Sequence, residues 1–113
     1  MHELSVTQSV LEIALTHARQ AGAERILRID LAVGALSGIV GESVQFYFDF
    51  IARDTIAEGA TLAFRHIPAR FRCLACGASY EPEDSDWTCP LCGELRPEVI
   101  GGREFLVESI DVE

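Results

Sequence analysis

The 113-residue sequence contains no lysine, few basic side chains and no long apolar run. Its net charge of −9 argues against non-specific nucleic-acid binding, because that binding needs a basic surface to displace phosphate counterions. A membrane-spanning helix needs roughly 20 mainly apolar residues in a row, and no stretch of the sequence approaches this length. The start of the chain also lacks the basic segment and apolar core of a signal peptide. We therefore expect a cytoplasmic protein without a nucleic-acid or membrane partner.

The absence of lysine also decides how a glycine-rich stretch, residues 34–41 (GALSGIVG), is interpreted. A phosphate-binding loop ends in Gly-Lys-Ser/Thr, and its lysine reaches the phosphate groups. This segment has no such ending. The glycines therefore indicate a turn-rich connection rather than a nucleotide site.

The first predicted helix spans about residues 6–21. Ser5 and Gln8 have the spacing of a capping box, in which two side chains bond the free N–H groups at a helix start. Apolar residues recur behind them at helical spacing, and Gly22 is a typical C-terminal stop. His17 is in register with this apolar face, so we expect it at the edge of the core rather than at a metal.

The second predicted helix lies within residues 42–55. Its apolar positions at i, i+3, i+4 and i+7 favour a helix, and they are Val44, Tyr47, Phe48 and Ile51. The alternation of phenylalanines at 46, 48 and 50 competes with this interpretation. In a helix, Phe46 and Phe50 widen the apolar arc beyond one stripe. We expect a deeply packed helix, with a partner-docking face as the alternative.

Strands are predicted at residues 26–33, 59–67 and 102–113, where apolar and polar residues alternate. His66 falls on the second of them, and we expect it on the strand surface. Two helices and three strands make a small α/β (α+β) fold, with both helices packed on a three-stranded sheet. Because the last strand follows the cysteines, residues 70–101 are predicted to be an inserted module. Residues 1–69 and the strand 102–113 then form the other domain.

The four cysteines form two pairs, Cys73-x-x-Cys76 and Cys89-x-x-Cys92, each followed by glycine. Disulfides are rare in the cytosol, and two bridges would only tie together a short segment with few neighbours. The spacing is that of four thiolates that converge on one tetrahedral metal ion. The sequence therefore predicts a four-cysteine metal site of the zinc-ribbon type.

Zinc and iron both accept four thiolates, and Tyr80 and Trp87 could shield an iron centre. The short separation between the pairs favours zinc. A site with four protein ligands has no position for water, so the sequence predicts a structural and not a catalytic ion. The segment between the pairs has little apolar material, and metal binding would supply its folding free energy.

The chain starts with Met1-His2-Glu3. Methionine is removed only before a small residue, so we expect the Met1 amine to persist. That amine, the His2 backbone nitrogen and the His2 Nδ1 atom can close two chelate rings around one ion. A fourth donor could be the Glu3 backbone nitrogen or its carboxylate, and Ni(II) and Cu(II) prefer such planar nitrogen sites. The alternative is an inert terminus whose acid only complements a helix dipole.

Together, MHELSVTQSV, LAVGALSGIV, the four cysteines and the closing ESIDVE resemble the HypA/HybF family of nickel-insertion metallochaperones over essentially the whole chain. The resemblance implies Ni(II) as transient cargo at His2, with the Met1 amine and Glu3 as neighbours. It also implies structural Zn(II), whose ligands are Cys73, Cys76, Cys89 and Cys92. The implied partners are a HypB-type GTPase and the large-subunit precursor of nickel–iron (NiFe) hydrogenase, with urease accessory proteins for some relatives.

Other functional patterns are weaker. The acidic residues of the cysteine segment lack the full ligand pattern of a calcium loop, and these are Glu81, Glu83, Asp84 and Asp86. No carboxylate pair is placed for acid–base catalysis, so we expect a metallochaperone and not an enzyme. The first alternative is a zinc-ribbon protein-interaction adaptor without nickel transfer, and the second is an iron-knuckle redox protein.

Overall fold

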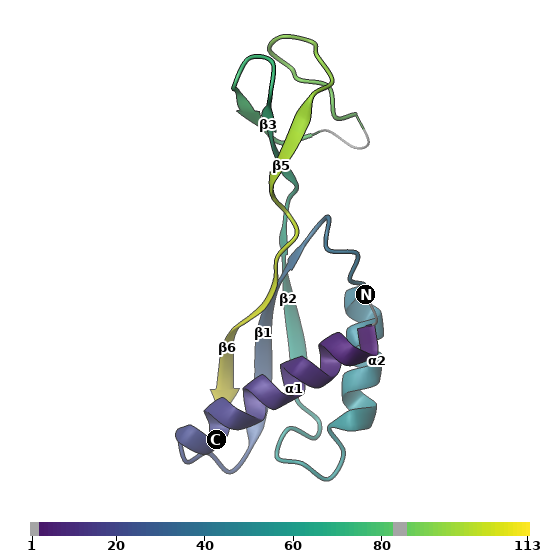
Figure 1. Cartoon of the computed structure of the whole chain (residues 1–113). Coiled ribbons are helices and arrows are strands. Elements are labelled where there is room, and N and C mark those ends of the chain that lie inside the picture. The colour runs from purple at the N-terminus through teal and green to yellow at the C-terminus, as the bar shows by residue number, and fades with distance from the viewer. Residues whose placement is uncertain (1–2, 83–85) are drawn as a thin grey trace.

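The computed structural model describes residues 3–82 and 86–113, which form an elongated molecule of 55 × 24 × 17 Å (Figure 1). The elements are, in chain order, α1 (Glu3–Gln20), β1 (Ile26–Gly34), α2 (Gly41–Ile51), β2 (Thr61–Ile67), β3 (Arg70–Cys73), β4 (Ser79–Tyr80), β5 (Pro97–Gly101) and β6 (Phe105–Val112). In the described part of the chain, no helix is both long and apolar enough to cross a bilayer.

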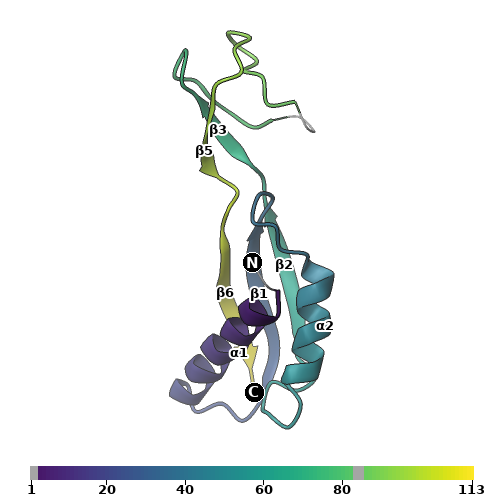
Figure 2. The same ribbon diagram turned by 45° about the vertical axis from the view of Figure 1, so that its right-hand side comes forward.

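Three strands form the larger sheet, in the order β2-β1-β6 (Figure 2). The central strand β1 runs parallel to β2 and antiparallel to β6, so that Ile29 lies between Leu62 and Ile110. The register shifts after Asp30, which leaves Glu108 as an extra residue in β6. The three strands are those that the alternation pattern predicts.

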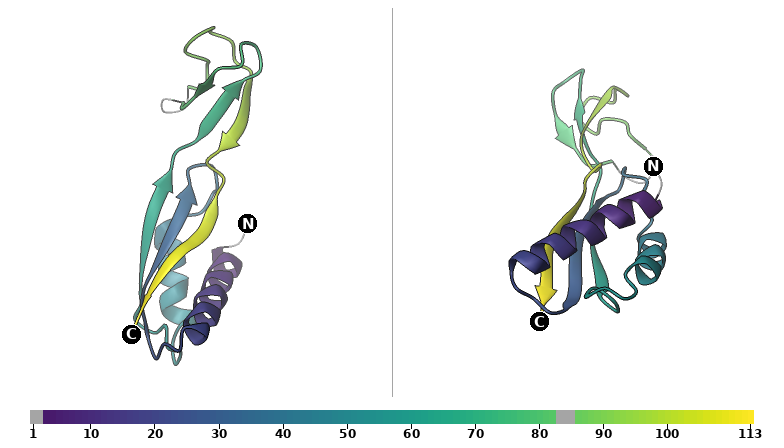
Figure 3. Two further views of the ribbon diagram at one scale, coloured as in Figure 1. Left: turned by 90° about the vertical axis from the view of Figure 1, so that its left-hand side faces the viewer. Right: turned by 60° about the horizontal axis from the view of Figure 1, so that its bottom comes forward.

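Both helices cover the same face of this sheet, and the other face is left open (Figure 3). The core between helices and sheet is built from buried apolar residues, including Val10, Ala14, Ile29, Leu31, Val44 and Phe48. The predicted architecture, two helices packed on a three-stranded sheet, is therefore confirmed.

The start and the buried face of α1 differ from the sequence-based expectation. The helix already includes Glu3, so Ser5 lies inside its first turns and the predicted capping box is wrong. The buried face carries Thr7 and Val10, whereas Ile13 and His17 are exposed. A threonine can occupy this face because its Oγ1 donates a 2.6 Å hydrogen bond to the Glu3 carbonyl one turn earlier. The predicted stop at Gly22 is confirmed by its left-handed φ of 68°.

Helix α2 buries Val44 and Phe48, as the spacing predicts, but it does not bury every phenylalanine. Phe46 is 70% exposed and Phe50 is 64% exposed, so the expected deep packing is wrong for these two residues. Helix α2 packs mainly against α1 and only slightly against β2, and Val44 and Phe48 fill the side that faces this core. Phe50 is partly shielded by the guanidinium of Arg53, 5.0 Å above its ring.

A second sheet, of order β4-β3-β5, makes up the cysteine-containing segment and was not predicted as a sheet. It stands at the far end of the molecule, where the chain passes from β2 into β3 and returns from β5 into β6 (Figure 1). Its small core consists of Phe71, Cys73, Tyr80 and Cys89.

At the junction between the two sheets, two backbone segments lie in direct contact. A Cβ atom added at Gly34 would collide with the carbonyl group of Gly102, so only glycine fits at this crossing. Leu36, two residues after Gly34, donates its N–H to the Gly102 carbonyl at 2.6 Å and places its side chain against the core of the second sheet. The connection after β1 therefore joins both parts of the fold.

Candidate metal centre

The structure brings the four cysteine sulfurs together at one place in the second sheet. Cys73 ends β3 and Cys76 follows in the next turn, whereas Cys89 and Cys92 come from the connection between β4 and β5. All four Sγ atoms lie within 4.8 Å of one another. Within the described ranges 3–82 and 86–113, this is the group of His, Cys, Asp and Glu side chains that could hold an ion.

The distances between the sulfurs fit a tetrahedral ion and not a disulfide. Sγ of Cys73 lies 3.6 Å from Sγ of Cys92, and Sγ of Cys76 lies 3.7 Å from Sγ of Cys89. Sulfurs bound at 2.3 Å to one tetrahedral zinc are separated by about 3.8 Å, whereas a disulfide requires about 2.05 Å. The donor set and its spacing therefore fit Zn(II).

The two cysteine turns have the same backbone structure. Gly77 donates its N–H to the Cys73 carbonyl at 2.8 Å, and Gly93 donates to the Cys89 carbonyl at 3.0 Å. Both glycines adopt a left-handed φ, 80° at Gly77 and 77° at Gly93, which costs other residues free energy. The glycine after each pair is thus required for the turn that aims the thiolates inward.

Backbone N–H groups in these turns stabilise thiolates before any ion binds. The N–H of Cys92 lowers the pKa of Cys89 to about 7, and the N–H of Leu91 adds to this effect. Burial acts in the opposite direction and raises this pKa. The N–H of Cys76 in the same way lowers the pKa of Cys73. One cysteine of each pair therefore has a lowered pKa, which favours the thiolate form that metal binding requires.

An aromatic cluster takes the place of a large core in this module. Phe71 is fully buried, with its ring centre 5.8 Å from that of Tyr80 and 4.9 Å from that of Trp87. The Tyr80 hydroxyl donates a 2.6 Å hydrogen bond to the Trp87 carbonyl, which ties the acidic connection back to β4. Few other apolar side chains pack here, so the module has only a small apolar core of its own.

The predicted terminal site lies only partly within the described residues. Met1 and His2 are outside them, and Glu3 is the first described residue. The Glu3 carboxylate accepts a 2.9 Å hydrogen bond from the backbone N–H of Val40, at the start of α2. The local sequence contains no signal for this contact, because the partners are 37 residues apart. The start of α1 and the cysteine module lie apart in the fold (Figure 1).

The acidic connection does not resemble a cation loop where it is described. Asp86 accepts a 3.1 Å hydrogen bond from the N–H of Thr88, as in an ordinary turn. The side chain of Thr88, together with this N–H, lowers the pKa of Asp86. Glu81 is exposed, and Glu83 and Asp84 lie outside the described residues.

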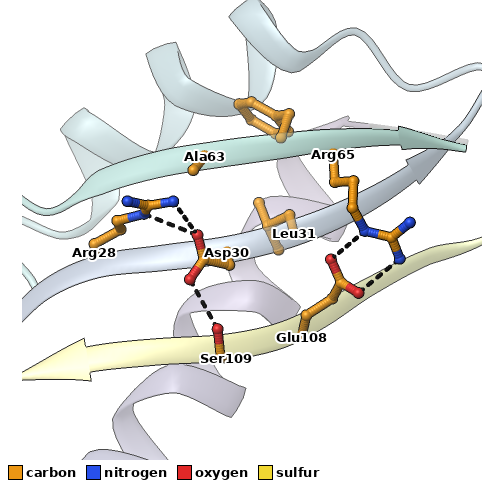
Figure 4. Close-up of a pocket in the computed structure, with 8 residues that line it drawn as sticks. Arg28, Asp30, Leu31, Ala63, Arg65, Glu108 and Ser109 are labelled. Carbon is orange, nitrogen blue, oxygen red and sulfur yellow. Dashed lines mark hydrogen bonds and ion pairs between the residues drawn. The ribbon is translucent and has the colours of Figure 1, made fainter.

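The open face of the larger sheet carries paired charges around a shallow hollow of about 470 Å³ (Figure 4). Arg65 holds Glu108 with two hydrogen bonds of 3.0 and 2.7 Å. Asp30 accepts hydrogen bonds of 2.8 Å from both Arg28 and Ser109. Each carboxylate is neutralised by a neighbour, and the arginine lowers the pKa of Glu108, so neither is set up as a proton donor.

Comparison with known proteins identifies the family. A family model described as "Hydrogenase/urease nickel incorporation, metallochaperone, hypA" matches residues 1–112. The hydrogenase maturation factor HypA of Dehalococcoides mccartyi is 43% identical over 113 residues, which cover 100% of this chain and 95% of the relative. The factor of the same name from Caldanaerobacter subterraneus is 40% identical over 114 residues, and the match covers 100% of this chain and 100% of the relative.

Two solved structures share the fold. A solution structure of a HypA protein superposes with a TM-score of 0.75 at 22% identity, over 100% of this chain and 97% of the other. The solution structure of the nickel metallochaperone HypA from Helicobacter pylori gives a TM-score of 0.69 at 21% identity, over 99% and 97% of the two chains. With the family model matching almost every residue, the chain belongs to the HypA family of hydrogenase and urease nickel-incorporation metallochaperones.

Proposed function

We propose that this protein binds Ni(II) at its N-terminus and delivers it to the large subunit of NiFe-hydrogenase during maturation. The observation that carries the proposal is the match to the nickel-incorporation family over residues 1–112, which includes the terminal Met1-His2-Glu3. An exposed terminal chelate suits transfer by ligand exchange, because an incoming protein ligand can reach the metal without unfolding the donor. The role is delivery and not catalysis.

The donors that we propose are the Met1 amine, the His2 backbone nitrogen and the His2 imidazole, which leave one position of a planar site open. Glu3 is the third residue of the proposed site. Its carboxylate is engaged with the Val40 N–H, which supports a contribution through the Glu3 backbone nitrogen rather than through the side chain. Glu3 would then also hold the terminus in place.

For the four cysteines we propose a structural Zn(II). The support is a complete set of four protein sulfurs at tetrahedral spacing, which leaves no position for cargo exchange. We also propose two domains, residues 1–69 completed by residues 102–113, and a zinc ribbon of residues 70–101. The two separate sheets and the two separate apolar clusters support this division.

The proposed partners follow from nickel delivery. They are a HypB-type GTPase, the large-subunit precursor of NiFe-hydrogenase and, where urease is served, its accessory proteins. The thiols suit a reducing compartment such as the cytoplasm, because their metal ligation requires that they stay unoxidised. The alternative is a zinc-ribbon adaptor whose terminus binds no nickel.

A nickel titration of zinc-loaded protein separates these functions. Three forms are compared: untagged protein, protein with one extra residue before Met1, and His2→Ala. We expect only the untagged form to bind Ni(II) tightly, since the other two forms lose the amine geometry or the imidazole. Equal binding by all three forms would overturn the nickel proposal and leave the adaptor.

A further inference from the structure

Helix α2 carries an exposed stripe on the side that faces away from the core, made of Glu42, Phe46, Phe50 and Arg53. These residues are spaced by four, four and three positions, and side chains at such spacing lie on one side of a helix. Phe46 is 70% exposed and Phe50 is 64% exposed, more than any other aromatic residue in the described part of the chain. Figure 2 shows α2 at the edge of the molecule, where another protein can reach this side. The fold itself therefore has no use for these two large rings.

Both rings of the exposed stripe have a neighbour that fixes their orientation. The ring of Phe46 packs edge-on against that of Tyr47, with 5.6 Å between the ring centres. The ring of Phe50 lies under the guanidinium of Arg53, at 5.0 Å from its centre. Because these side chains are already ordered, little conformational entropy is lost when a partner covers them. Ordered and exposed aromatic residues of this kind are typical of protein interfaces.

Opposite charges stand at the two ends of the exposed stripe. Glu42 lies in the first turn of α2, four residues before Phe46. Arg53 follows the C-cap residue of the helix, and its position over Phe50 places it on the same side. The order along the helix is therefore acidic, aromatic, aromatic and basic.

This order is complementary to itself when two copies of α2 lie antiparallel. A two-fold axis midway between Phe46 and Phe50 places Phe46 opposite the partner's Phe50, and the reverse. The same axis brings Glu42 to within one residue, about 1.5 Å along the helix, of the partner's Arg53. Such a contact is isologous, because both copies supply the same surface and every pairing occurs twice.

We propose that two copies of this protein associate through the exposed stripes of their α2 helices, antiparallel and around a two-fold axis. This association goes beyond nickel delivery and does not depend on it. A second copy matches both charged ends and both rings by symmetry. Because each copy carries a net charge of −9 and the contact is limited to one side of a short helix, the dimer is weak and forms in a concentration-dependent manner.

Other acidic groups near the exposed stripe modify this contact. Asp54 and Glu58 follow Arg53 in the sequence, but they line a separate hollow together with Glu24. Asp49 is exposed and lies one residue from the level of the two-fold axis, so the two Asp49 carboxylates approach each other at the rim of the contact. Like charges at this distance oppose association. Asp49→Asn should therefore strengthen the dimer.

The antiparallel arrangement also keeps the two chain starts apart. Helix α2 has 11 residues and is therefore about 16 Å long. The start of α1 is bonded through Glu3 to Val40, at the N-terminal end of α2. In the dimer these ends lie at opposite ends of the contact, so neither chain start covers the other.

The test is sedimentation of reduced, zinc-loaded, full-length protein over a range of concentrations. We expect a reversible monomer–dimer equilibrium for wild type, with a dissociation constant that Phe46→Ala and Phe50→Ala each raise about tenfold or more. Leu91→Ala is the matched control, because Leu91 is 78% exposed but lies in the cysteine module, and it should associate as wild type. A wild type that stays monomeric at every concentration would overturn the inference and leave the exposed stripe to a different partner.

Charge reversal tests the antiparallel arrangement itself. Glu42→Arg alone and Arg53→Glu alone place like charges opposite each other, so each variant should be monomeric. An equimolar mixture of the two variants restores both ion pairs and should form a mixed dimer, a recovery that misfolded variants could not show. Failure of the mixture to associate, or a dimer that persists unchanged in both single variants, would overturn the proposed contact.

Discussion

The carboxylate of Glu3 accepts a 2.9 Å hydrogen bond from the backbone N–H of Val40. This contact joins the start of α1 to the start of α2, where no side chain of the N-cap residue itself bonds the helix. An acidic group at this place also complements the positive end of the α2 dipole. The start of α1 at Glu3 is thereby attached to the start of α2.

Removal of this carboxylate should loosen the terminus and lower stability. We expect Glu3→Ala to reduce the free energy of unfolding by about 0.5–1 kcal/mol, as measured by urea denaturation, whereas Glu12→Ala, on the exposed side of α1, should have little effect. Glu3→Gln keeps an oxygen acceptor for Val40 and should bind nickel nearly as wild type. A complete loss of nickel binding in Glu3→Gln would show instead that the carboxylate is a ligand.

Removal of the metal from the cysteines should unfold the second sheet and spare the first. A strong chelator should therefore change the fluorescence of Trp87, the single tryptophan, whose ring packs 4.9 Å from Phe71. The far-ultraviolet helix signal should persist, because α1 and α2 belong to the other core. Cys76→Ser should reproduce the fluorescence change without chelator. An unchanged fluorescence after complete metal removal would contradict the structural role of the ion.

The Arg65–Glu108 pair predicts a contribution to stability that is lost in acid. The hydrogen bonds and charge of Arg65 lower the pKa of Glu108 below its ordinary value of 4.5 in the folded state. A carboxyl with a depressed folded pKa stabilises the protein above the unfolded value, and this contribution disappears as the pH falls through the folded pKa. The urea midpoints of wild type and Glu108→Gln should therefore differ at neutral pH and converge below 4.5. A difference in urea midpoint that grows as the pH falls would contradict the stabilising role of the Arg65–Glu108 pair.

The close approach of Gly34 to Gly102 predicts a large loss of stability when one methyl group is added at Gly34. Gly34→Ala directs a Cβ atom at the backbone of Gly102, which has no side chain that could move aside. We expect a loss of about 2 kcal/mol or more in the free energy of unfolding, measured by thermal or urea denaturation. Gly41→Ala is the matched control, because its Cβ would meet only the Phe64 ring, at 3.2 Å. Equal stability of the two variants would contradict the close approach.

Some features followed directly from local sequence. The four cysteines converge because each pair lies in a turn with its own glycine, and the two turns need only one short connection to face each other. The strands 26–33 and 59–67 were visible because a sheet with one covered face requires alternation. The second sheet was missed because β3 and β4 are only four and two residues long, too short to show a pattern.

The sequence by itself determined the two helices, the three strands of the larger sheet, the cysteine cluster and the turn at Gly22, since each depends on residues close together in the chain. Only the tertiary structure decided which side of each helix is buried, because that depends on where the sheet lies. Phe46 and Phe50 were therefore misjudged, although their helix was correctly predicted. The structure alone also placed the Glu3 carboxylate beside the N–H of Val40. Contacts between distant segments arise from packing and leave no local pattern.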